Sequence, residues 1–242
     1  MASLYFRTDL DRVNEGDLIT LDGPELTHAV TVARVRAGEH LMIGNGRGLL
    51  ISGVVVEAHS RALTVRSERV QFVDRPELKI TLVQALAKGD RDERAVQAST
   101  ELGVDDIVPW SASRSVSRWE GPKLSRGQQR WSTIAREASK QSIRAWIPRV
   151  GDLVTTQGIA ALGSTQRVLV LEPTAETALT ELSFDDRSIA LVVGPEGGVT
   201  PEEHRILCAA GAISVRLGST VLRTSTAGPA ALTALSVLLH RW

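Results

Sequence analysis

The sequence contains a single cysteine, Cys208, among 242 residues, and its aromatic content is only 4%. One cysteine excludes an intramolecular disulfide framework and any zinc site that needs paired cysteines. Residues 1–7 lack the basic and then apolar pattern of a secretory signal, and the longest apolar run, near residues 229–239, is too short to span a bilayer. We therefore expect a cytoplasmic protein with no membrane segment.

The chain also lacks net charge, because 28 basic residues balance 28 acidic ones. The distribution is nevertheless uneven: residues 111–150 contain nine basic and two acidic residues, a net charge of +7. Four of the five tryptophans lie in or beside this stretch: Trp110, Trp119, Trp131 and Trp146. Cations with aromatic rings between them suit phosphate contacts and base stacking on a nucleic acid. The alternative is a solvated basic helix whose tryptophans belong to the core.

Residues 1–73 are predicted to form a small β-barrel. The apolar runs 40–43 and 49–56 flank the glycine-rich residues 44–48, a pattern typical of a hairpin, and residues 61–70 alternate between apolar and polar. A strand comes after these glycines, whereas a dinucleotide-binding glycine motif opens a helix. We place the domain boundary in the polar residues 74–77.

Residues 74–242 alternate between strand and helix patterns. Strands are predicted at 80–87, 104–110, 167–171, 189–193 and 213–217; helices are predicted from Asp90 with a capping box to Glu93, at 128–146, from Thr200 with a second capping box, and at 230–239. Helix 128–146 places Trp131, Ile134, Ala135 and Ala138 on one face. The alternation indicates an α/β domain with a mainly parallel sheet covered on both sides.

The loops after the last three predicted strands are the candidate binding site, because ligands of parallel sheets gather where strands end. They contain Glu172, the sequence Gly194-Pro195-Glu196-Gly197-Gly198, and residues 218–224. Glycines allow main-chain N–H and C=O groups to approach a ligand closely. For Gly198 a tight turn before the helix is the better interpretation.

Common catalytic signatures are absent: the sequence has no zinc-protease, P-loop or serine-hydrolase motif. The histidines are scattered, and His28 and His204 fit surface positions. Cys208 is predicted to be a buried, inert thiol in the helix that begins near Thr200.

The sequence resembles the RsmE family of 16S ribosomal RNA uridine N3-methyltransferases. The resemblance is carried by residues 194–198 with the threonine-capped helix after them, by Leu217-Gly218 and by Val221-Leu222-Arg223-Thr224. Supporting matches are His28, residues 88–91, residues 101–104 with Pro109 and Arg114, and the Trp131 helix with residues 137–139 and 141–142. The resemblance covers essentially the whole chain.

This resemblance implies a PUA-like β-barrel for RNA at 1–73 and a SPOUT methyltransferase domain with a trefoil knot at 74–242. It also implies a homodimer that binds S-adenosylmethionine without a metal. The cofactor-binding residues it implies are Leu171, Glu172, Gly194, Pro195, Glu196, Gly197, Leu217, Gly218, Val221, Leu222, Arg223 and Thr224. The chain departs from the family pattern at Ser219-Thr220, at Ser225, where the family has glutamate, and at Lys140 and Ile143, where it has glutamate and glycine.

The implied reaction is methylation of uridine N3 in the 16S RNA or the 30S subunit. The enzyme must remove the N3 proton or stabilise the resulting anion. Arg223 is the candidate for anion stabilisation, although it could instead form an interface or helix-start ion pair. Glu196 and Glu172 are candidates for the base, and either could instead balance the sulfonium.

The basic side chains expected to contact RNA are Arg7, Arg114, Arg118, Arg126 and Arg130. Three alternatives stay open at this point: a non-catalytic RNA-binding or ribosome assembly factor, an α/β enzyme that binds a phosphorylated small molecule at a helix N-terminus, and a SPOUT methyltransferase for another RNA site.

Overall fold

The computed structural model describes residues 3–242 and divides the chain into two compact units. The first unit contains the residues up to Arg75 together with Ser139–Ile147, and the second contains Pro76–Ala138 and Pro148–Trp242. We propose that the two folding domains meet after residue 73.

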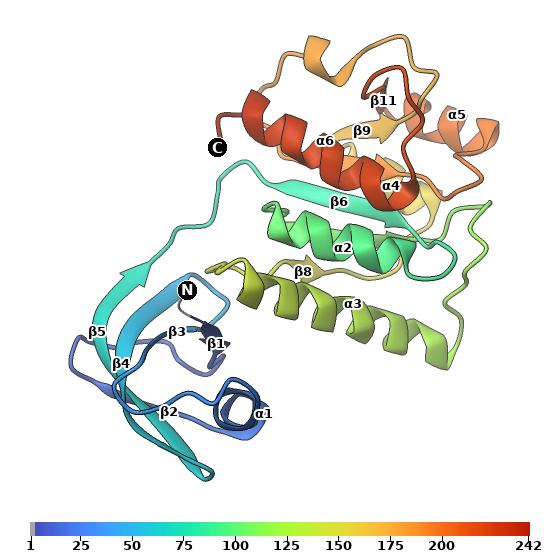
Figure 1. Cartoon of the computed structure of the whole chain (residues 1–242). Helices are drawn as coiled ribbons and strands as arrows, with labels where there is room; N and C mark the ends of the chain where they lie inside the picture. The colour runs from blue at the N-terminus through green and yellow to red at the C-terminus, as the bar shows by residue number, and fades with distance from the viewer. Residues whose placement is uncertain (1–2) are drawn as a thin grey trace. The chain divides into compact units, whose positions relative to one another are not determined.

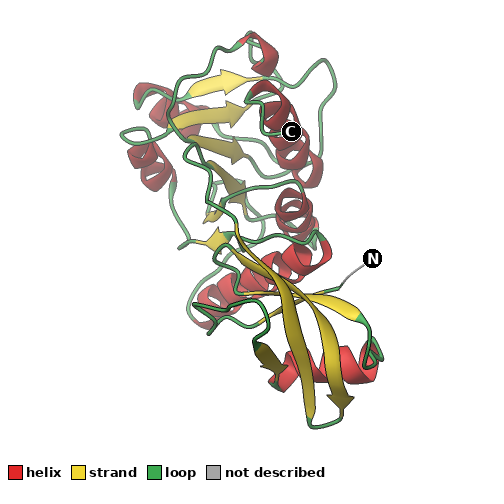
Figure 2. Cartoon of the chain, turned by 90° about the vertical axis from the view of Figure 1, so that its left-hand side faces the viewer, coloured by secondary structure: helices red, strands yellow, loops and turns green. Residues whose placement is uncertain are grey.

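The first unit is built on a five-stranded sheet with strand order β1-β3-β4-β5-β2. Its elements are β1 (Leu4–Phe6), β2 (Leu18–Leu21), α1 (Gly23–Thr27), a π-helical turn (His28–Val32), β3 (His40–Gly44), β4 (Leu49–His59) and β5 (Ala62–Phe72). Strand β1 is parallel to β3, and the other pairs are antiparallel. The hairpin predicted around residues 44–48 is confirmed as β3–β4, and the longer hairpin β4–β5 is prominent in Figure 2.

The core of the first unit follows the alternation seen in the sequence. Leu63, Val65 and Ser67 are buried on β5, and apolar side chains of β3 and β4 pack against the first two. Trp146 packs against the end of β5: its Nε1–H donates to the Val73 carbonyl at 2.8 Å, and its ring meets Phe72 edge-on. Trp146 is therefore a packing residue.

The second unit is a six-stranded parallel sheet with order β11-β9-β10-β6-β7-β8. The strands are β6 (Ile80–Ala85), β7 (Asp106–Trp110), β8 (Arg149–Val150), β9 (Arg167–Leu171), β10 (Ile189–Val193) and β11 (Ile213–Val215). The helices are α2 (Arg91–Glu101), α4 (Thr156–Leu162), α5 (Pro201–Ala209) and α6 (Thr224–Leu238), with a 3-10 turn at Leu179–Glu181. Helix α3 (Pro122–Gln141) belongs to this unit up to Ala138. The α/β class is confirmed.

Helices cover both faces of this sheet. One face packs against α2, α3 and α6, and Figure 1 shows α2 and α6 running side by side there. The other face packs against α4 and α5. The central strands β6 and β10 are buried on both sides, which explains why β10 is a continuous apolar run and why β6 is mostly apolar.

Three tryptophans of the second unit, Trp110, Trp119 and Trp131, pack within the protein, whereas Trp242 is exposed. Trp110 and Trp131 are fully buried, and Trp119 packs edge-on against Trp131 with ring centroids 5.0 Å apart. Burial of Trp131, Ala135 and Ala138 confirms the predicted inner face of the basic helix. The base-stacking interpretation is therefore wrong for Trp110 and Trp131, and the edge-on packing of Trp119 against Trp131 favours the alternative of core tryptophans.

Three helix predictions need correction. Helix α3 covers Pro122–Gln141 rather than 128–146, and α6 begins at Thr224 and includes Pro229. The predicted capping box of α2 does not form, because the Asp90 carboxylate accepts from Arg94 instead of from the backbone. The errors at the ends of α3 and α6 come from using one polar or proline residue as a helix boundary, whereas α2 begins after Asp90 as predicted.

Helix α3 ends in a Schellman motif with an unusual residue. The Arg144 N–H donates to the Ser139 carbonyl at 2.9 Å, and the Ile143 N–H donates to the Lys140 carbonyl at 3.3 Å. The motif requires a left-handed residue at Ile143, whose φ is 52°. Glycine normally takes this position, and for a β-branched residue the conformation is strained.

We expect Ile143→Gly to raise the free energy of unfolding by about 1 kcal/mol, because glycine has no left-handed penalty. Urea unfolding measures the change. Ile143→Ala is the matched control, since it removes the same side chain beyond Cβ but keeps the penalty. Equal destabilisation by both variants would show that Ile143 packing outweighs backbone strain.

Candidate functional site

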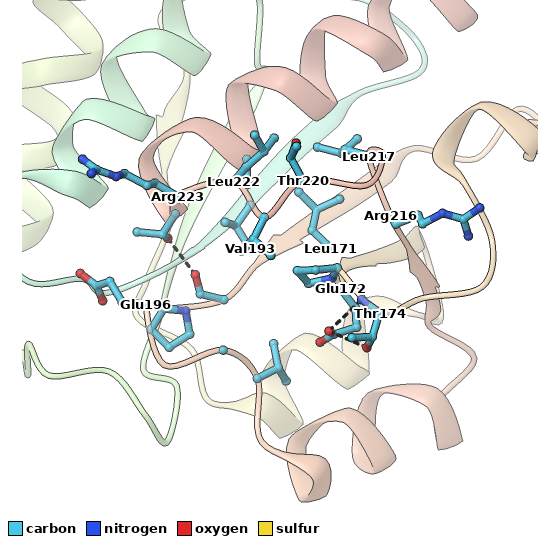
Figure 3. A pocket seen from close by; sticks show the side chains of 18 of the residues that line it. Leu171, Glu172, Thr174, Val193, Glu196, Arg216, Leu217, Thr220, Leu222 and Arg223 are labelled. Atoms are coloured by element: carbon cyan, nitrogen blue, oxygen red, sulfur yellow. Dashed lines mark hydrogen bonds between the residues drawn. The ribbon is translucent and has the colours of Figure 1, made fainter.

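A cavity of about 680 Å³ lies at the carboxyl ends of β9, β10 and β11. The loops that follow these strands form its walls, as Figure 3 shows. All twelve residues predicted to bind a cofactor line it: Leu171, Glu172, Gly194, Pro195, Glu196, Gly197, Leu217, Gly218, Val221, Leu222, Arg223 and Thr224. The parallel strand direction brings these distant segments to one edge of the sheet.

The glycine-rich loop after β10 leaves little room for side chains at two positions. A Cβ at Gly194 would lie 3.0 Å from Val199 Cγ2, and one at Gly197 would lie 3.1 Å from Arg114 Cβ. Main-chain groups therefore form the cavity wall at these glycines. Gly198 has a φ of 72°, as its interpretation as a turn residue requires.

A buried hydrogen-bond relay joins the glycine loop to the start of α6. The Thr224 hydroxyl donates to the Gly194 carbonyl at 2.8 Å and accepts from Gln84 Nε2 at 2.9 Å. Gln84 is fully buried near the end of β6, in register with Val193 of β10. Gln84 was not predicted from the sequence; an amide side chain inside a mostly apolar central strand was the available signal.

Glu196 anchors the segment after β6. Its Oε1 accepts from the Lys88 N–H at 3.0 Å and from Arg91 Nη1 at 2.7 Å. Partial burial acts to raise the pKa of Glu196, but hydrogen bonds from its own N–H, from Arg91 and from Lys88 outweigh it, so the pKa lies below its ordinary value. Glu196 is thus a carboxylate at neutral pH and a weak base.

Arg223 immediately precedes α6, and its exposed side chain lines the cavity. Within residues 3–242 its guanidinium has no hydrogen bond or ion pair, so its donors are available to a ligand. In Figure 3 Arg223 and Glu196 lie on one side of the cavity, while Glu172, Thr174 and Arg216 lie on the other. Glu172 Oε1 accepts from the Thr174 hydroxyl at 2.9 Å.

Glu203 has a role that was not predicted, beyond the capping box with Thr200, which is confirmed. Its buried carboxylate accepts from the Ser113 N–H at 2.8 Å and from the Thr156 hydroxyl at 3.2 Å, besides the Thr200 N–H and hydroxyl. Burial acts to raise the pKa of Glu203, but the hydrogen bonds from Ser113 and Thr200 outweigh it and lower the pKa. Glu203 therefore ties the loop after β7 to the start of α5.

Most arginines predicted to contact RNA have partners within the protein. In the second unit Arg114 Nη1 donates to the Gly197 carbonyl at 2.8 Å, Arg118 binds the Ala112 and Ser113 carbonyls, and Arg130 pairs with Glu93. In the first unit Arg7 pairs with Asp9 at 2.6 Å. Arg126 is exposed on α3 and has no such partner in the described part of the chain. Several of these cations thus also hold the local fold.

Cys208 is exposed, so its prediction as a buried thiol is wrong. Its Sγ lies 3.7 Å from His204 Nδ1 on the outer side of the short helix α5. His204 is half-buried, and its Nε2 lies 2.6 Å from the Ser214 hydroxyl. Across residues 3–242, no helix is long and apolar enough to cross a membrane.

Two protein-family models match the chain. The RNA methyltransferase domain covers residues 74–236, and the RNA methyltransferase PUA domain covers residues 21–66. Together with the α/β sheet and its edge cavity, these matches define the class of protein: an RNA methyltransferase with a PUA domain.

Relatives specify the class further. The ribosomal RNA small subunit methyltransferase E of Mycobacterium bovis is 41% identical over all of this chain and 94% of its own length. The enzyme of the same name from Neisseria gonorrhoeae, solved with bound S-adenosylmethionine, is 26% identical with a TM-score of 0.88 and 98% coverage of both chains. A putative methyltransferase from Legionella pneumophila, solved with the same cofactor, is 29% identical with a TM-score of 0.87 and 98% coverage of both chains. The chain belongs to the ribosomal RNA small subunit methyltransferase E (RsmE) family, which confirms the resemblance.

We expect Glu203→Gln to lower the free energy of unfolding at pH 7 by about 1–3 kcal/mol, because it weakens charge-assisted hydrogen bonds. A lowered carboxyl pKa contributes stability that is present above the ordinary value of 4.5 and lost as pH falls through the folded pKa. The difference in unfolding free energy between wild type and Glu203→Gln should therefore become smaller as the pH falls below 4.5. Urea unfolding at pH 7 and pH 4 measures it.

The matched control for this prediction is Glu202→Gln, at the exposed neighbouring residue of α5. Its effect at pH 7 should be the smaller of the two. A stability difference for Glu203→Gln that stays constant from pH 7 to pH 4 would contradict the role of the ionised carboxylate.

Proposed function

We propose that this protein transfers a methyl group from S-adenosylmethionine to N3 of a uridine in the 16S RNA of the small ribosomal subunit. The observation that carries the proposal is the cavity formed by the loops after β9, β10 and β11, in a chain of the RsmE family. Relatives with the same fold were solved with S-adenosylmethionine, which supports this ligand. The choice of uridine N3 follows from the family resemblance.

The residues of the cavity fit this cofactor. Its volume of about 680 Å³ suits a ligand of nucleoside size, and Leu171, Val193 and Leu222 supply apolar wall. Main-chain groups around Gly194 and Gly197 offer hydrogen bonds without side-chain obstruction. When bound, S-adenosylmethionine supplies an electrophilic methyl group on a sulfonium.

Arg223 and Glu196 have different roles in the proposed reaction. Loss of the uridine N3 proton spreads negative charge onto O2 and O4, and the unpaired Arg223 guanidinium can donate hydrogen bonds to that anion. Glu196 has a lowered pKa and accepts a hydrogen bond from Arg91. It is therefore better suited to balance the sulfonium charge and to anchor the glycine-rich loop than to remove the N3 proton. Low basicity argues against Glu196 as the general base.

We assign RNA contact to the PUA domain and to the exposed cations of α3 and the loop before it. Arg126 has free donors, whereas Arg114, Arg118 and Arg130 retain only some of theirs. Arg7 supplies a cation on the first unit. These contacts would fix the register of the RNA, and the cavity would select the base.

The assembly, the knot and the location of the protein are also proposals. Val221 and Val237 expose 79% and 58% of their surface, which favours a second copy covering the region around α6. The trefoil knot rests on the family resemblance. Action on the small ribosomal subunit implies a cytoplasmic location.

Incubation with labelled S-adenosylmethionine and 30S particles that lack the modification tests the function. We expect the label in the 16S RNA, as N3-methyluridine after nucleoside digestion, because the family match covers the whole chain. RNA binding without label would favour the non-catalytic assembly factor. Label on another nucleoside would favour a SPOUT enzyme for a different site.

Arg223→Ala should lower kcat by about 100-fold and change the cofactor Kd little, because the guanidinium acts on charge that develops in the transition state. Single-turnover methyl transfer and calorimetry measure the two effects. Arg187→Ala, at an exposed arginine paired with Asp185 outside the cavity, is the control. If Arg223→Ala keeps wild-type turnover and unchanged cofactor affinity, Arg223 does not stabilise the uridine anion.

A further inference from the structure

The segment from Glu172 to Ala178 forms one wall of the cavity through Glu172, Pro173 and Thr174. It connects β9 to the 3-10 turn that begins at Leu179. Backbone hydrogen bonds attach both of its ends to β11 and the residue after it: the Glu172 N–H donates to Val215, and the Thr177 carbonyl accepts from the Arg216 N–H, both at 3.0 Å. We call residues 172–178 the wall segment.

The middle of the wall segment is attached by one side chain. Arg216 Nη1 donates to the carbonyl of Ala175 at 2.9 Å and to that of Glu176. Figure 3 shows the Arg216 side chain directed away from the cavity, toward the loop that contains Thr174. A planar guanidinium suits this task because it presents several donors in a fixed geometry.

Nothing else in the described residues replaces this attachment. The remaining hydrogen bonds of residues 173–176 are local, from the Thr174 N–H and hydroxyl to the Glu172 carboxylate and from the Ala175 N–H to the Glu172 carbonyl. Without the Arg216 guanidinium, the middle of the wall segment would keep only this turn. The segment would then have many conformations to lose when a ligand binds.

We propose that Arg216 is a positioning residue for the cofactor, which preforms the cavity by holding the wall segment against β11. This inference rests on the proposed function, because it names S-adenosylmethionine as the ligand. Preorganisation contributes to affinity by removing the cost of ordering a loop during binding. The residue acts through the wall segment and not on the reacting atoms.

The test compares wild type, Arg216→Ala, Arg216→Lys and the control Arg187→Ala, whose residue is exposed and does not line the cavity. Calorimetry with S-adenosylmethionine gives Kd, and methyl transfer to 30S particles gives kcat and the cofactor KM. We expect Arg216→Ala to raise Kd and KM about tenfold with kcat little changed. Lysine, with one donor group in place of the fork, should restore part of the affinity.

Hydrogen exchange separates positioning from a general structural role. Faster exchange confined to amides of residues 173–178 in Arg216→Ala, with an unchanged melting temperature, is the expected pattern. Equal Kd for wild type and both Arg216 variants would overturn the inference, as would a loss of kcat at unchanged Kd. If wild type itself does not bind S-adenosylmethionine, the proposed function fails and the inference fails with it.

Discussion

The parallel direction of the six strands is the constraint on which the cavity depends. Parallel strands end on the same edge of a sheet, so loops that are far apart in the chain become neighbours. The chain must cross back between strands, and the crossing helices bury both faces of β6 and β10. A rigid apolar layer thereby supports a site made largely of irregular backbone.

Hydrogen bonds then fix each loop at that edge. The hydroxyl of Thr224 joins the glycine loop to α6, the carboxylate of Glu203 joins α5 to the loop after β7, and the guanidinium of Arg216 holds the wall segment. In each case a side chain forms a hydrogen bond with a main-chain N–H or C=O group of a loop. These main-chain groups are outside regular secondary structure and need such partners. A ligand that is recognised by main-chain groups requires loops held in place by such side-chain hydrogen bonds, because irregular loops lack the regular backbone hydrogen bonds of helices and sheets.

Much of the positive charge of residues 111–150 is used in contacts within the protein. The basic stretch of residues 111–150 has the composition of an RNA surface, yet several of its arginines bind carbonyls or carboxylates of their own unit. Arg223 differs because its guanidinium has no partner in the described part of the chain and borders the cavity. An unpaired cation that borders a cleft is a better candidate for ligand binding than the arginines that already pair within the protein.

The sequence by itself determined the α/β class, the hairpin β3–β4, the buried alternation of β5 and the three loops of the cavity. These features depend on local periodicity, turn residues and strand ends, which a linear pattern records. Family resemblance added the cofactor-binding set, including residues whose chemistry alone would not single them out.

Only the tertiary structure decided the true ends of α3 and α6, the exposure of Cys208 and the full burial of Trp110. It also decided the roles of Gln84, Glu203 and Arg216, whose partners are far away in the sequence. Long-range contacts cannot be predicted from the local sequence pattern. A polar residue in the sequence is expected to be solvent-exposed, and only the structure shows that another element packs against it.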